Sequence, residues 1–200
     1  IMPDACPAGS APATIPVGGA IAVENAIIPN AHSADICCSM FATFFESANP
    51  VGEMLDSLMA STRFGYGGRK PDQLVHPPVV DEPVFENRFL SGLENHARIH
   101  MADQGDGNHF AYIGQFRMPD SGSDALQHAG HDDTFAPVRG RECLALVTHH
   151  GSRGLGAHVY KRGQIAALKH TNKVATGIPN AAAWLDFDSP EGRDYWDALQ

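Results

Sequence analysis

The sequence has little charge, few aromatic residues and no long apolar run. Charged residues make up 18% of the 200 residues and aromatic residues 8%, whereas an average domain is about one quarter charged. No apolar stretch approaches the roughly 18–20 residues of a membrane-spanning helix, so we expect no membrane segment. Glycine (20) and proline (14) are plentiful, which excludes a coiled coil or a long-helix bundle. The composition favours an α+β domain with stacked mixed or antiparallel sheets flanked by helices.

Cysteine is also scarce, and the four cysteines do not have the spacing of a disulfide framework. No charged segment followed by an apolar segment opens the chain, so we find no secretory signal. Reduced thiols and a cytoplasmic protein are therefore expected. The chain begins with Ile1, and residues 188–200 have the pattern of an interrupted helix. We expect residues 1–200 to form a single domain that is incomplete at both ends.

Positive charge is scarce overall but concentrated in one segment. The formal net charge is -9, and a uniformly acidic protein binds polyanions poorly because phosphate affinity comes from Lys and Arg. Seven basic residues and one acidic residue nevertheless lie between Arg139 and Lys173. This segment is either a docking site for a nucleotide or nucleic acid, or a solvated helix face.

Apolar spacing predicts the main elements. We expect a turn over 102–108 and a helix after each of Pro50, Pro83, the glycine-rich turn 151–156 and Ser189. The first of these helices has a periodic apolar face that we expect to be buried. Strand patterns occur at 14–30, 33–45, 109–117 and 142–150.

Three short segments carry residues suited to metal or phosphate chemistry. Asp35 and Cys38 stand three residues apart beside an apolar run, and a carboxylate with a thiolate suits Mn, Fe or Zn. His109 begins a predicted strand after Gly107 and Asn108. His149 ends a second strand. Each segment also has a plain structural explanation, as core cysteines, a capped turn or a strand–turn–helix connection.

The third segment, residues 147–156, contains the most residues suited to binding a metal or a phosphate. A strand delivers His149 to a glycine-rich turn that leads into a helix, whose first backbone amides form an anion site. Arg153 adds a bidentate phosphate contact. There is no GxxxxGK[ST] loop, HExxH helix or CxxC pair, and no GxSxG elbow surrounds Ser152. Together the three segments outline a metal-plus-phosphate site.

These motifs, in this order, resemble the RtcB family of RNA-splicing ligases. The resemblance rests on Met-Pro-Asp-Ala at 2–5, IAVENAIIP at 21–29, DICCSM at 35–40, GNHF at 107–110 and HHGSRG at 149–154. It implies an RtcB-like fold and an enzyme that joins RNA 2′,3′-cyclic phosphate or 3′-phosphate ends to 5′-hydroxyl ends, in tRNA splicing or RNA repair. The reaction would use GTP, two Mn²⁺ ions and a guanylylated histidine that passes GMP to the RNA.

The resemblance also implies a role for each motif residue. Asp35, Cys38 and His109 would hold one Mn²⁺ ion. Cys38 would bridge to the second ion, which His149 would also bind. A thiolate can form such a bridge because it has several lone pairs, and two metals at one bridge neutralise a triphosphate.

The remaining implied roles concern GTP, RNA and residues beyond this chain. Asn108 would contact the GTP phosphates beside His109. Arg153 and Ser152 would face the RNA phosphate or the triphosphate. The guanylylated histidine and the third ligand of the second metal would lie beyond Gln200, so the nucleophile is not expected within these residues.

Three positions depart from the family pattern and keep other functions open. Cys6 replaces a usual histidine, Cys37 replaces the glycine before the metal-binding cysteine, and Tyr112 replaces a carboxylate that contacts guanine. One alternative is a non-ligating homologue that binds RNA ends or nucleotide. A second is a metal-dependent phosphatase or nuclease, and a third is an α+β domain without chemistry.

Overall fold

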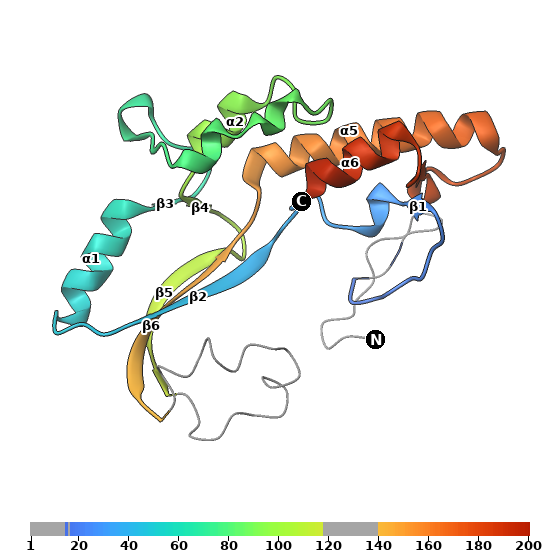
Figure 1. Ribbon diagram of the computed structural model, residues 1–200. Helices are drawn as coiled ribbons and strands as arrows, with labels where there is room; N and C mark the ends of the chain where they lie inside the picture. The colour runs from blue at the N-terminus through green and yellow to red at the C-terminus, as the bar shows by residue number, and fades with distance from the viewer. Residues whose placement is uncertain (1–14, 16, 118–139) are drawn as a thin grey trace. The chain divides into compact units, whose positions relative to one another are not determined.

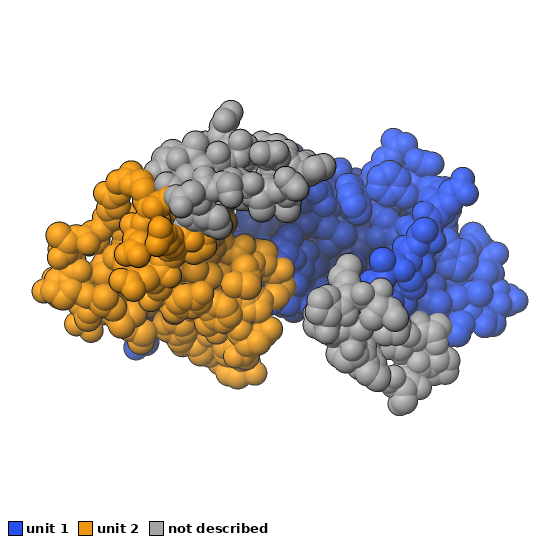
Figure 2. Space-filling view, turned by 90° about the horizontal axis from the view of Figure 1, so that it is seen from below, with its two compact units in different colours: residues 1–37, 69–101, 151–200 blue, residues 38–68, 102–150 orange. Residues whose placement is uncertain are grey.

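The computed structural model describes residue 15, residues 17–117 and residues 140–200. The motif at residues 2–5 and Cys6 lie outside these residues. The chain forms two compact units, coloured separately in Figure 2. Unit 1 contains residues 1–37, 69–101 and 151–200, and unit 2 contains residues 38–68 and 102–150. The expectation of a single domain stays a prediction.

Unit 1 is mainly helical and is organised around its longest helix (Figure 1). Short 3-10 helices occur at Pro29–Ala31, Pro71–Gln73, Pro78–Asp81, Pro83–Glu86 and Asn180–Ala182. The other elements are β1 (Ala26–Ile27), α2 (Glu94–His100), α5 (Arg153–Val174), β7 (Leu185–Asp186) and α6 (Pro190–Leu199). Strands β1 and β7 pair antiparallel, and α5 packs against α2, α6 and β7.

Small residues on α5 let α6 approach it closely. Val159 and Ala167 are buried on α5, and Tyr195 of α6 is fully buried beside them. A Cβ atom at Gly163 would overlap the Tyr195 ring, so glycine is required for this approach. Burial raises the pKa of the Tyr195 hydroxyl, with a smaller contribution from Tyr160. The hydroxyl forms a 2.9 Å hydrogen bond with His32 Nε2.

Unit 2 is built on a small antiparallel sheet. Strand β6 (Glu142–His150) lies between β2 (Ser39–Phe45) and β5 (Phe110–Arg117), and both neighbours run antiparallel to it. Helix α1 (Val51–Ser61) follows β2 and contacts β5. Two short strands, β3 (Arg63–Phe64) and β4 (Asp103–Gly105), pair parallel beside them. The α+β class expected from the composition is therefore confirmed, with small sheets and separate helices.

Several elements match their sequence patterns closely. Strands β5 and β6 occupy the predicted ranges to within one residue, and α1 begins after Pro50 as expected. The helix expected after the glycine-rich turn 151–156 is present as α5, but it begins at Arg153, inside the segment expected to be a turn. Ser189 caps α6 because its side chain accepts the Gly192 backbone N–H at 2.9 Å.

Other expectations are wrong, in most cases because local apolar content was taken for burial or for regular structure. In the described part of the segment 14–30, Ala26–Ile27 form a strand and Val17 makes an isolated bridge, so most of this part is not strand. Strand β2 is exposed over most of its length, although its sequence is an apolar run. No residue of α1 is buried, although its apolar face is periodic. The expected turn 102–108 contains buried strand β4, and the helix after Pro83 is a 3-10 turn followed by α2 at Glu94.

Across the stretches that the structure describes, no helix combines the length and hydrophobicity needed to span a membrane.

Candidate metal centre

The pairing order of the unit 2 sheet brings three sequence-distant residues to one end. Because β2 and β5 both run antiparallel to β6, their first residues lie beside the last residues of β6. Cys38 directly precedes β2, and His109 directly precedes β5. His149 is the second-last residue of β6 and pairs with Met40 and Phe110. Topology alone therefore gathers Cys38, His109 and His149.

These three side chains have the spacing of metal ligands. One ligand atom from each lies within 4.8 Å of the other two. The Cys38 Sγ lies 3.0 Å from His149 Nε2, and the two imidazole rings meet edge to face with centroids 5.2 Å apart. Cys38 is exposed and both histidines are half-buried, so an ion can enter from solvent.

Backbone carbonyls fix the orientation of both imidazoles. His149 Nδ1 lies 2.9 Å from the Asn108 carbonyl, and His109 Nδ1 lies 3.2 Å from the Gln104 carbonyl. A carbonyl only accepts, so each Nδ1 carries the proton and each Nε2 carries the lone pair. The Cys38 thiol therefore donates to His149 Nε2 when no metal is bound. Carbonyl partners on the second nitrogen are typical of histidines that bind metals.

Gln104 forms hydrogen bonds to both β5 and β6, at the ends where His109 and His149 lie. It is 5% exposed, within buried strand β4. Its amide nitrogen donates to the Phe110 carbonyl at 2.7 Å and also to the His149 carbonyl. The adjacent Asp103 carboxylate accepts the Gly105 N–H at 3.0 Å. Sequence reasoning missed Gln104 because its segment has the composition of a turn. All three residues of β4 are buried, and β4 pairs with β3.

The donor set fits a borderline transition-metal ion. One sulfur and two imidazole nitrogens suit Zn²⁺, Fe²⁺ or Co²⁺ better than Mg²⁺ or Ca²⁺, which prefer oxygen. Three protein ligands leave positions open for water or substrate, as in catalytic rather than structural sites. The cluster can therefore hold one ion with an exchangeable position.

Asp35, also predicted as a ligand, belongs to unit 1 and has a structural role there. Its Oδ1 accepts the Ser152 backbone N–H at 3.0 Å, at the start of α5. The Ser152 hydroxyl is a further 3.5 Å contact. A side chain at Gly151 would overlap the Asp35 carboxylate, so the HHGSRG motif is shaped around this contact. Metal ligation by Asp35 stays a prediction.

The other predicted site residues are divided between the two units. Asn108 is exposed in unit 2 and contributes its carbonyl to His149. Arg153 opens α5 in unit 1 with a left-handed φ of 51°. Tyr112 is 48% exposed on β5. The phosphate and guanine roles of these residues stay predictions.

The basic segment combines structural and solvent-exposed cations. Arg141 forms an ion pair with Glu46 in unit 2. Arg162 on α5 donates to the Phe89 and Ser91 carbonyls at 3.0 and 2.9 Å, which anchors the preceding loop in unit 1. Lys161, Lys169 and Lys173 are exposed along α5. The exposed lysines fit the solvated helix face, and the docking site for a nucleotide or nucleic acid stays a prediction.

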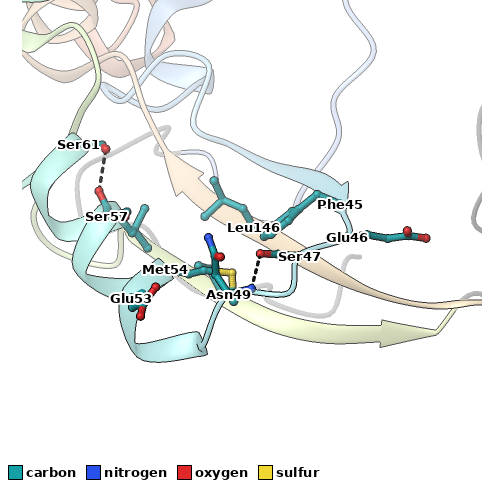
Figure 3. A pocket seen from close by; sticks show the side chains of 11 residues that line it. Phe45, Glu46, Ser47, Asn49, Glu53, Met54, Ser57, Ser61 and Leu146 are labelled. Carbon is teal, nitrogen blue, oxygen red and sulfur yellow. Dashed lines mark hydrogen bonds between the residues drawn. The ribbon is translucent and has the colours of Figure 1, made fainter.

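A separate groove lies on the same sheet, away from the metal-ligand cluster. Its volume is about 500 Å³, and it lies between α1 and the strands (Figure 3). Phe45 ends β2, and Ile113 and Leu146 lie inside β5 and β6, so the groove is towards the opposite end of β2 from Cys38. Met54 and Leu58 of α1 complete its apolar lining. No residue of the metal-ligand cluster lines it.

The fold and the cluster thus define an α+β protein with a candidate Cys–His–His metal centre. In comparisons with known proteins, no family model matches the chain, and no curated protein matches it.

Proposed function

We propose that unit 2 binds a divalent transition-metal ion through Cys38, His109 and His149. The observation that carries this proposal is the convergence of three ligand atoms, from three separate chain segments, within 4.8 Å of one another. The carbonyl partners on both Nδ1 atoms support it, because they orient Nε2 as the coordinating atom.

We further propose that this centre serves an RNA ligase of the kind that the RtcB family represents. The ordered motifs support the proposal, and so do the exposed lysines of α5, since RNA phosphates bind Lys and Arg. Mn²⁺ and GTP are the proposed cofactors, and RNA with 3′-phosphate or 2′,3′-cyclic phosphate and 5′-hydroxyl ends is the proposed substrate. A bound divalent ion would supply Lewis-acid stabilisation of phosphate charge.

The chain's own residues then have distinct tasks. Cys38 and the two histidines hold the ion at the open end of the sheet. Gln104 keeps the ends of β5 and β6 in register. Asp35 fixes the turn that begins α5, which presents Arg153 to a phosphate. The exposed site lets a large substrate such as an RNA end approach.

Metal binding is tested first, by adding Mn²⁺ or Co²⁺ to the reduced chain. The wild type should bind the ion, and Cys38→Ala should lose at least tenfold in affinity, because the only sulfur of the cluster is removed. Cys37→Gly is the matched control, since it removes the neighbouring thiol at a position whose φ of 59° suits glycine. Equal affinity in wild type and Cys38→Ala would show that the cluster is not a metal site.

The ligase reaction is tested with GTP, Mn²⁺ and labelled broken RNA. A longer protein containing this chain should form a covalent GMP adduct and join the ends. The 200-residue chain alone should bind metal without the adduct, since the nucleophilic histidine is expected beyond Gln200. Metal-dependent phosphate release from a 2′,3′-cyclic end without GTP would instead support a phosphatase or nuclease. Binding of RNA ends with no chemistry would support a non-ligating homologue, which Tyr112 motivates.

A further inference from the structure

Two adjacent thiols, Cys37 and Cys38, are both exposed to solvent and are not joined in a disulfide. The Cys37 thiol donates to the Leu199 carbonyl at 3.4 Å, whereas the Cys38 thiol is hydrogen-bonded to His149 Nε2. Cys143, by contrast, is buried in β6. One peptide bond joins Cys37 and Cys38, and Cys143 is buried, so among the described cysteines each is the other's nearest exposed thiol.

The backbone at Cys37 indicates that its side chain matters. Its φ of 59° lies in the left-handed region, which costs a non-glycine residue about 1–2 kcal/mol. Glycine would adopt this conformation without that cost. A cysteine at this position is therefore less favourable for the backbone than glycine, and what it adds is a thiol.

We infer that Cys37 and Cys38 form a reversible disulfide when the protein meets a hydroperoxide. In the first step the Cys38 sulfur attacks the peroxide, the O–O bond breaks, and a sulfenic acid forms while the peroxide leaves as water or an alcohol. The His149 imidazole is placed to relay the thiol proton to the leaving oxygen. In the second step the Cys37 sulfur attacks the sulfenic sulfur, the S–S bond forms and water leaves. The two thiols are oxidised by two electrons, and the hydroperoxide is reduced.

This disulfide would be easily reduced. Consecutive Cα atoms are about 3.8 Å apart, shorter than the roughly 4.4–6.8 Å that disulfides favour. Strain of this kind makes a disulfide more reducible, which suits a labile bond rather than a structural one. Cys37 would therefore protect Cys38 from irreversible oxidation to a sulfinic acid.

The disulfide does not depend on the proposed function, but its consequence does. A sulfur in a disulfide is no longer a thiolate ligand, so the oxidised form would lose the ion from the metal-ligand cluster. Reduction would restore binding.

The test treats metal-free chain with hydrogen peroxide, then alkylates it with iodoacetamide and weighs the peptide that contains both cysteines. In wild type and in Cys143→Ser, this peptide should be two hydrogen atoms lighter and should carry no alkyl group. Dithiothreitol should reverse the change. In Cys37→Gly, which suits the local backbone, Cys38 should give a dimedone-reactive sulfenic acid and then a sulfinic acid that dithiothreitol does not reverse. A wild-type peptide that oxidises like Cys37→Gly, or stays fully alkylated, would overturn the inference.

A second readout separates this inference from the proposed function. Reduced wild type and Cys37→Gly should bind Mn²⁺ or Co²⁺ equally. After peroxide and then dithiothreitol, wild type should recover its binding and Cys37→Gly should not. A reversible disulfide in a chain that never binds metal would support the inference and refute the metal centre. Equal recovery in both variants would overturn the protective role of Cys37.

Discussion

Replacing Gln104 with methionine tests whether the metal-ligand cluster depends on the strand that supports it. Methionine keeps the length and approximate volume of glutamine, so no cavity opens in β4. It removes the amide that donates to the Phe110 and His149 carbonyls. Each hydrogen bond contributes about 0.5–1.5 kcal/mol, so the two together predict a loss of about 1–3 kcal/mol in the free energy of unfolding.

Metal affinity should fall further than stability alone explains. Gln104 positions the backbone of His149, and changes to such outer-shell residues typically weaken metal binding about 10–100-fold. The assay is Co²⁺ titration of the folded reduced protein, followed by its visible absorption, with urea unfolding measured in parallel. Gln115→Met, an exposed position on β5, is the matched control and should change neither quantity. Unchanged Co²⁺ affinity in a folded Gln104→Met protein would refute the supporting role of this residue.

Three further predictions concern unit 1. Gly163→Ala should lower the free energy of unfolding by about 1–2 kcal/mol in a urea titration, because overlap with Tyr195 outweighs the gain in helix propensity; increased stability would show that α6 has room to move. Ser189→Ala should lower the free energy of unfolding by about 1 kcal/mol in the same titration, because α6 loses its N-terminal cap. Ser189→Thr should keep most of this stability, because threonine also has a hydroxyl that can cap the helix. Burial, and then the charge of His96, lower the pKa of His158 below 6.5 in the folded protein. As the pH falls, His158 is therefore protonated at a higher pH in the unfolded chain than in the folded protein. Stability should therefore be full above about pH 6.5 and decline as the pH falls through the lowered folded value, and His158→Gln should flatten that decline in urea midpoints measured across this range.

The sequence predicts the elements of this fold better than their burial. Residues 142–150 and 110–117 form strands because their β-branched and aromatic residues suit extended backbone. The spacing of the apolar residues of α1 correctly predicts a helix, yet none of them is buried. Periodic spacing shows that these residues share one side of the helix, but it does not show that another element packs against that side. Strand β4 escaped prediction since three residues with glycine and aspartate form a strand only when β3 pairs with them.

The candidate site shows the same division between local and non-local information. Each of Cys38, His109 and His149 stands at one end of an apolar segment, and the sequence alone shows this. Their convergence is not, because it requires β6 to lie between β2 and β5 with both neighbours antiparallel. Had β5 paired on the other side of β2, with the same three strands, His109 and His149 would lie a full strand apart. The ligand set is therefore a property of strand order, and Gln104, which bonds to both β5 and β6, is the side chain through which that order can be perturbed without touching a ligand.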